Sequence, residues 1–160
     1  MPQLVKGGKH AFGWSRVGRT GRIVVPQEAL DEYCLGEGEK LIAVPGSQRS
    51  GGFGLGAQES LGRSPLGRVL GVCTELADSS VPEGDLVVCE GKPYCWVQLR
   101  SGGIAISLKT LERYGIRSGD RLLVIRGSGL AIGFAVRGPI VAEASTHPEL
   151  LSLEPELEEE

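Results

Sequence analysis

The chain has 160 residues, of which 41% are hydrophobic, and this content is sufficient for one ordinary domain with a real core. Its formal net charge is −3, and no run approaches the roughly 20 apolar residues that span a bilayer, so no membrane segment is expected. Residues 1–10 lack the apolar core of a signal peptide, which favours a cytoplasmic protein.

A stretch near the N-terminus recurs 81 positions later without a gap in register. Residues 21–33 read GRIVVPQEALDEY, and residues 102–114 read GGIAISLKTLERY. A self-match at one constant offset indicates a duplicated supersecondary unit. Two copies are too few for a solenoid, so we expect one half to complete the other.

Each copy predicts the same order of elements: a strand with aromatic residues, a β-branched strand, a two-turn helix and two further strands. In the first copy they are residues 12–17, 22–25, 27–33, 40–44 and 53–55. In the second copy they are residues 94–99, 104–106, 108–114, 121–126 and 130–136. Trp14 and Trp96 occupy matching places, which favours a structural packing role for both.

The ends of the two predicted helices differ in chemistry. Pro26 suits the first helical position, whereas the Ser107 hydroxyl is predicted to cap the second helix. Gly115 is predicted to end that helix in the left-handed conformation. Cys34 takes this place in the first copy, where no glycine eases the conformation.

The pattern divides the chain into four segments. The two copies span residues 8–56 and 85–138, and a connector, residues 57–84, lies between them. Residues 68–75 and 85–90 are predicted as extra strands because both are apolar and border turn residues.

The last segment, residues 139–160, contains seven glutamates and no Lys or Arg. Acidic tails of this kind are usually disordered, so disorder is predicted here. A minority dock on a basic partner, or compete with nucleic acid for the basic face of their own chain. The rest of the chain carries all 17 Lys and Arg and is mildly basic.

No pattern typical of a metal, cofactor or catalytic site is present. The four cysteines form no CxxC pair, so buried reduced thiols are expected rather than zinc ligands; they are Cys34, Cys73, Cys89 and Cys95. Both histidines, His10 and His147, lie in terminal segments, which argues against a nucleophile–histidine pair. The glycine-rich residues 51–56 lack the Lys-Ser/Thr of a P-loop and are predicted as a hairpin turn. We therefore expect no enzyme, no cofactor and no metal site.

Residues 21–41 carry the run Gly-Arg-Ile-Val-Val-Pro-x-x-Ala-Leu-x-x-Tyr-x-Leu-x-x-Gly-x-x-Leu. This run resembles the SpoVT/AbrB (AbrB/MazE-like) family of swapped-hairpin domains. The second copy is similar to it more weakly, because Gly103 and Ser107 replace the arginine and the proline. The resemblance implies a mostly β fold with two short helices, in which two halves interleave hairpins into a pseudo-two-fold β-barrel. Family members are typically homodimers that act as prokaryotic transcription regulators or antitoxins.

The resemblance also implies a DNA-facing surface in the N-terminal strand and loop region. The candidate DNA-binding residues are Lys6, Lys9, Arg16, Arg19 and Arg22 in the first copy, with Arg100 and Lys109 in the second. Arg19 is expected at the tip of a hairpin turn, where guanidinium groups can meet phosphates or guanine edges. Because the second copy supplies fewer cations, we expect the contact with a duplex to be lopsided.

Two functions of different classes remain open from the sequence. The first is a DNA-binding transcriptional regulator with double-stranded DNA as its partner. The alternative is an antitoxin-like or scaffold protein-interaction module that uses its acidic tail and does not bind DNA; a ligand-binding barrel is a third possibility. The copies are expected to pair either within one chain, as an internal pseudo-dimer, or between the chains of a homodimer.

Overall fold

The computed structural model describes residues 11–64, 67–127, 130–148, 150 and 152–155. Strands hold 33% of the chain and helices 24%, which confirms a mostly β fold. Both predicted helices are present, and the described residues contain four further short helices outside the two copies.

Both copies contain the predicted order of elements, with their ends shifted by a few residues. The first copy forms β1 (Ala11–Arg16), β2 (Arg22–Val24), α1 (Gln27–Glu32), β3 (Lys40–Pro45) and β4 (Phe53–Ala57). The second forms β6 (Lys92–Gln98), β7 (Gly103–Ala105), α5 (Leu108–Arg113), β8 (Arg121–Arg126) and β9 (Ile132–Ala135). The Ser107 hydroxyl caps α5 as predicted, whereas Pro26 lies at the N-cap of α1, one position before the predicted one.

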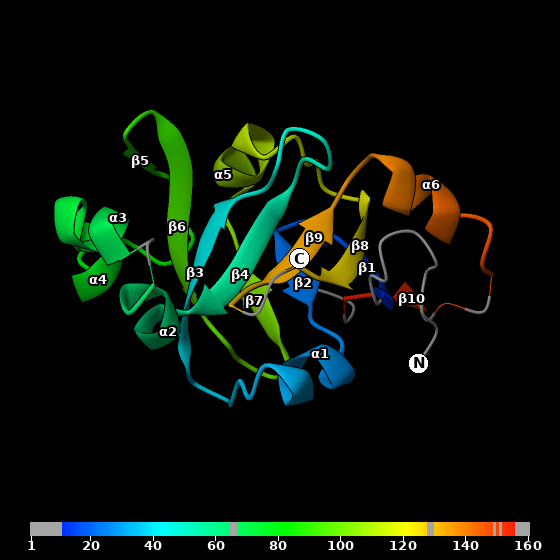
Figure 1. Ribbon diagram of the computed structural model, residues 1–160, viewed down its shortest axis with the longest axis horizontal. Coiled ribbons are helices and arrows are strands. Elements are labelled where there is room, and N and C mark those ends of the chain that lie inside the picture. Colours follow the sequence, from blue (N-terminus) through cyan, green and yellow to red (C-terminus); the bar gives the residue numbers. More distant parts are fainter. Residues whose placement is uncertain (1–10, 65–66, 128–129, 149, 151, 156–160) are drawn as a thin grey trace.

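Strands of one copy pair with strands of the other copy. β1 pairs with β8, and β6 pairs with β3, so the first strand of each copy lies beside the third strand of the other. β4 pairs with β9, and β2 pairs with β7 in a separate two-stranded sheet. The two halves therefore interleave within one chain, and Figure 1 shows their strands side by side across the centre of the molecule.

These pairings follow a pseudo-two-fold axis. Ile23 lies opposite Ile104, and Phe53 lies opposite Phe134, and the members of each pair are 81 positions apart in the sequence. The two phenylalanine rings stack with their centroids 4.7 Å apart. Equivalent residues meet each other only where a two-fold rotation relates the copies, so the sequence repeat is also a repeat in space.

The main core lies between the large sheet and the two-stranded sheet. It contains the axial residues Ile23, Ile104, Phe53 and Phe134, each at most 1% exposed. The apolar faces of α1 and α5 close this core from opposite sides (Figure 1). Each half thus buries its apolar residues against the other half, which a unit of this size needs because it buries too little surface alone.

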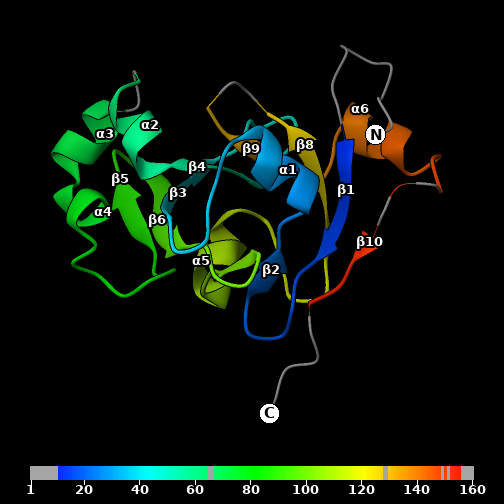
Figure 2. The same cartoon turned by 90° about the horizontal axis from the view of Figure 1, so that it is seen from below.

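The other face of the large sheet carries two smaller clusters at opposite ends of the molecule (Figure 2). At one end, α6 (Pro139–Ala144) covers a cluster that includes Trp14 and Leu123. At the other end, the connector covers a cluster that includes Ile42 and Tyr94. The connector forms α2 (Gln58–Gly62), α3 (Gly67–Val72) and α4 (Thr74–Asp78), followed by β5 (Val87–Cys89) at the start of the second copy.

Residues 68–75, predicted as a strand, lie in α3 and at the start of α4, so this prediction is wrong. Val69 and Leu76 are both buried in the cluster beside Tyr94. Val69 belongs to α3 and Leu76 to α4, and these two short helices, separated at Cys73, bury both side chains in the same cluster. The other predicted extra strand, 85–90, is present as β5.

Cys73 and Cys89 form a disulfide with their Cα atoms 6.1 Å apart, so the prediction of reduced thiols is wrong for this pair. The bond joins the end of α3 to β5 across 16 residues of sequence. Of the other two cysteines, Cys95 is buried and Cys34 is exposed.

The acidic segment is ordered where the structure describes it. α6 buries Ala144, and Leu150 adds to the same cluster. β10 (Ser152–Leu153) then pairs in parallel with β1. For residues 139–148, 150 and 152–155 the structure thus differs from the predicted disorder, because apolar residues between the glutamates find a partner on the outer face of the sheet.

The larger sheet has the order β10-β1-β8-β9-β4-β3-β6-β5. Its two ends are β10 and β5, and no pairing among the described residues joins them. Closure into the predicted barrel therefore stays a prediction. Within the described ranges, no helix is long and apolar enough to cross a membrane.

Candidate nucleic-acid interface

Four arginines gather where β1 ends against the turn that precedes β8. Arg16 lies opposite Arg121 in the β1–β8 ladder. Arg117 belongs to the turn before β8, and Arg19 belongs to the turn after β1. The two turns adjoin, because the Val17 N–H donates to the Asp120 carbonyl at 2.9 Å and the Gly119 N–H donates to the Val17 carbonyl at 2.8 Å. We call Arg16, Arg19, Arg117 and Arg121 the basic end.

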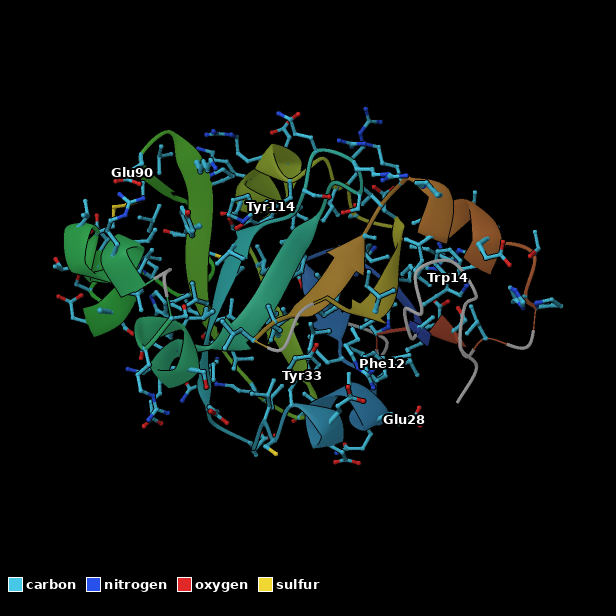
Figure 3. The ribbon with its side chains drawn as sticks, viewed as in Figure 1. Phe12, Trp14, Glu28, Tyr33, Glu90 and Tyr114 are labelled. Atoms are coloured by element: carbon cyan, nitrogen blue, oxygen red, sulfur yellow. A yellow bond between two sulfur atoms is a disulfide. The ribbon has the colours of Figure 1, made fainter. Side chains whose placement is uncertain are left out.

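Arg121 is held in place by an aromatic ring. Its guanidinium lies 4.2 Å from the centre of the Trp14 ring, and Trp14 itself is buried beneath α6 (Figure 3). Lys40, the repeat equivalent of Arg121, lies over Trp96, with its Nζ 5.6 Å from the centre of the ring. Cation–π contacts of this kind orient a cation while leaving its charge available to an anion. The matching tryptophans therefore have the structural role predicted from their places in the repeat.

Arg16 combines a structural contact with an ion pair. Its Nη1 donates to the Gly119 carbonyl at 2.7 Å, and Gln98 makes the equivalent bond in the second copy, to the Gly38 carbonyl at 2.8 Å. The Arg16 Nε also lies 3.0 Å from a carboxylate oxygen of Glu154, just after β10. The Arg16 side chain is 42% exposed, so it remains in contact with solvent while the tail neutralises its charge.

The Arg22 side chain binds the backbone of the turn before β7. Its Nη2 donates to the carbonyls of Arg100 and Ser101, at 2.9 and 3.2 Å. The repeat equivalent of Arg22 is Gly103, and a Cβ on Gly103 would lie 2.9 Å from the Arg22 guanidinium carbon. The missing arginine of the second copy thus has a steric reason, because a side chain there would meet the Ile23 backbone carbonyl, 2.7 Å from such a Cβ, as well as the Arg22 side chain.

The second copy's turn forms an end with more carboxylates. Arg100 pairs with Glu83 and also donates to the Gln98 side chain. The Ser101 N–H donates to the Glu37 carboxylate at 2.7 Å. Since Glu37 is the repeat equivalent of Ser118, beside Arg117, the two ends of the molecule differ in charge. The lopsided contact with a duplex stays a prediction.

Of the remaining candidates, the structure places only Lys109. Lys109 is exposed on α5, in the second copy. Lys6 and Lys9 lie outside the described residues. The chain enters β1 at Ala11, which pairs with Ile125, whereas Arg16 pairs with Arg121 at the other end of the same strand. A six-residue strand is about 20 Å long, so the described chain starts well away from the basic end.

Sequence reasoning missed Arg117 and Arg121. They belong to the second copy, and only the pairing of β1 with β8 brings them beside Arg16 and Arg19. The interleaved topology that the resemblance implies was the signal that could have found them, because it brings strands of the two copies side by side. The sequence also missed the partners that neutralise Arg16 and Arg100, which are Glu154 and Glu83.

Two buried titratable groups in the core, Cys95 and Tyr114, have a structural role. Burial raises the pKa of the Cys95 thiol to about 12 and raises the pKa of Tyr114 as well, so both groups stay protonated and uncharged. The Tyr114 hydroxyl donates to the Pro93 carbonyl at 3.2 Å, inside the core near α5 (Figure 3). In the part of the chain that the structure describes, no cluster of three or more His, Cys, Asp or Glu residues is placed to hold a metal ion.

The basic end is thus a set of four arginines on two adjoining turns and the β1–β8 strand pair, in which Trp14 fixes the Arg121 guanidinium and the Gly119 carbonyl and Glu154 fix that of Arg16. Its chemistry suits an anion with several charges in a row, because guanidinium groups bind phosphates through paired N–H donors. Comparisons with models of protein families, with curated proteins and with solved structures found no match to this chain.

Proposed function

We propose that this protein is a DNA-binding transcriptional regulator of SpoVT/AbrB type, and that its basic end contacts the phosphates of a DNA duplex. In this proposal the two copies form one swapped-hairpin barrel inside a single cytoplasmic chain that has no enzymatic activity. The observation that carries the proposal is the meeting of Arg16, Arg19, Arg117 and Arg121 at one end of the interleaved halves. The motif at residues 21–41 supports the assignment to this class.

The two halves have unequal roles in this proposal. The basic end carries four arginines against two carboxylates, those of Asp120 and Glu154. At the opposite end, Glu83 and Glu37 bind Arg100 and the Ser101 N–H, which leaves less net charge for phosphate. In this proposal, phosphate contacts set the position of the protein along the duplex. Base-specific contacts come from the same few guanidinium groups.

The double substitution Arg19→Gln with Arg117→Gln tests the proposal. Each phosphate contact that is lost reduces the slope of log Kobs against log salt by about 0.9, so we expect this variant to bind more weakly, with a slope smaller by about 1.8. The measurement is fluorescence anisotropy of a labelled random duplex, titrated at four salt concentrations. Arg22 is unsuitable for this test because its side chain holds the turn at Arg100 and Ser101.

A matched control separates a local effect from net charge. Arg49→Gln with Arg63→Gln removes the same two charges from exposed positions in the first copy's hairpin turn and in the connector. The control variant should keep the parent slope. Equal slopes and affinities in the parent and in both double variants would contradict the assignment of the basic end. The antitoxin-like alternative, in which the acidic tail binds a protein partner, stays a prediction.

A further inference from the structure

The C-terminal segment docks on the strand that carries the basic end. α6 and Leu150 pack on the outer face of the sheet, over Trp14. Ser152 and Leu153 then pair with Trp14 and Ser15 along the edge of β1. The next residue, Glu154, places its carboxylate against Arg16. We call residues 152–155 the strap.

The strap and a DNA phosphate would need the same atoms of Arg16. Glu154 accepts from the Arg16 Nε, at 3.2 Å, while Nη1 is bound to the Gly119 carbonyl. A carboxylate and a phosphate are both anionic acceptors for a guanidinium group, so one excludes the other at a given N–H edge. Four of the five residues that follow the strap in the sequence are also glutamates, and these repel a nearby phosphate backbone.

The strap is weakly held compared with the core. β10 has two residues and forms the edge of the sheet, and the Glu154 side chain is 56% exposed. An exposed ion pair stabilises a fold only slightly. A short edge strand held by few contacts opens at low free-energy cost, whereas β1 and β8 lie within a ladder of five paired positions.

We infer that the strap is an intramolecular competitor of DNA: it occupies Arg16 in the free protein and is displaced when the duplex binds. The inference rests on the proposed function. It also accounts for a basic end beside an acidic tail in one chain. Displacement of the strap costs the same free energy for every duplex, so the tail lowers the overall affinity for DNA and leaves the ratio between sites unchanged.

The substitution Glu154→Gln tests the inference without removing the strand. We expect this variant to bind random duplex about two- to fivefold more tightly at low salt, because Arg16 no longer has to leave a carboxylate. Its salt slope should be steeper than that of the parent, because in the parent salt also weakens the Arg16–Glu154 ion pair and so relieves part of the competition. Glu143→Gln is the matched control: it removes one tail charge whose partner is His147 rather than Arg16.

Amide hydrogen exchange supplies a second readout on the parent protein. Addition of duplex should accelerate exchange at Ser152 and Leu153 while exchange at Leu122 and Leu123 in β8 stays slow.

The binding measurements on the three proteins have four outcomes. Tighter binding by Glu154→Gln, while Glu143→Gln binds like the parent, supports the competition. Binding that appears only in Glu154→Gln supports it as well. If the parent binds DNA and both variants match it, the strap is not a competitor and the proposed function stands. If none of the three proteins binds duplex, the proposed function itself fails.

Discussion

Cys34 has a backbone conformation that its side chain disfavours. Its φ is +56°, and its repeat equivalent Gly115 has φ +82°. Both residues follow the last turn of a helix, where a left-handed residue lets the chain reverse. A Cβ on Gly115 would meet no atom within 4 Å, so the difference between the copies is one of backbone strain rather than of crowding.

We predict that Cys34→Gly stabilises the protein. A left-handed conformation costs a non-glycine residue about 1–2 kcal/mol, and part of the gain is lost because glycine makes the unfolded chain more flexible. The expected net gain is about 0.5–1 kcal/mol, measured as a higher urea midpoint at an unchanged m-value. Gly115→Ala is the reciprocal variant and should lose about 1 kcal/mol. A midpoint that falls in Cys34→Gly would show that the thiol makes a contact worth more than the strain.

At the scale of elements, the connector consists of three short helices that cover one end of the large sheet. The Cys73–Cys89 disulfide joins the end of α3 to β5 and lies in a cluster with Leu61 and Leu76. Disulfides are uncommon in cytosolic proteins outside hyperthermophiles, so the predicted cytoplasmic location requires either that exception or a bond that forms conditionally. The location therefore stays a prediction.

We predict that loss of this disulfide destabilises the protein by about 3 kcal/mol, the value typical of a loop of this length. Urea denaturation of the parent with and without reductant measures it, and Cys73→Ala with Cys89→Ala should match the reduced parent. Cys34→Ala is the control, because it removes an exposed thiol and should keep the response to reductant. Four titratable thiols in the denatured, unreduced parent would show that the bond is absent in solution.

At the scale of the whole molecule, each half is incomplete without the other. The four pairings that join the halves are β1–β8, β3–β6, β2–β7 and β4–β9. Fusion of the two units in one chain converts what would be an association of two chains into an intramolecular step, with a high effective concentration of the partner half.

We therefore predict a melting temperature that does not depend on protein concentration. When folding requires two chains, mass action raises the midpoint as the concentration rises. Here a hundredfold range of concentration, followed by circular dichroism and calorimetry, should give one cooperative transition at a constant temperature. A midpoint that climbs with concentration would show that the halves exchange between chains in solution.

Most of the local structure was predictable from the sequence. The strands and the two helices of the repeats were found because they depend on neighbouring residues: β-branched runs, turn glycines and the Ser107 cap. The connector was predicted less well. Its segment 68–75 is apolar enough for either element, and only the packing of α3 and α4 on the sheet, which buries Val69 and Leu76, selects helices.

The candidate site was predictable only in part. Arg16 and Arg19 lie at the basic end, but Arg22 holds a turn and Arg100 is paired with Glu83. A side chain's partner across the fold depends on strand pairing that no local pattern encodes. For this reason the sequence identified the residue type and the turn but not which arginines remain available to a phosphate.

By itself, the sequence determined that two equivalent units follow one another and where each of them turns, because repeat and turn signals are local. Only the tertiary structure decided that the units interleave within one chain, that Arg117 and Arg121 lie beside Arg16, and that Glu154 lies against Arg16. These contacts join residues up to 138 positions apart. They form only when the apolar faces of both halves are buried together, so the burial of the common core decides them.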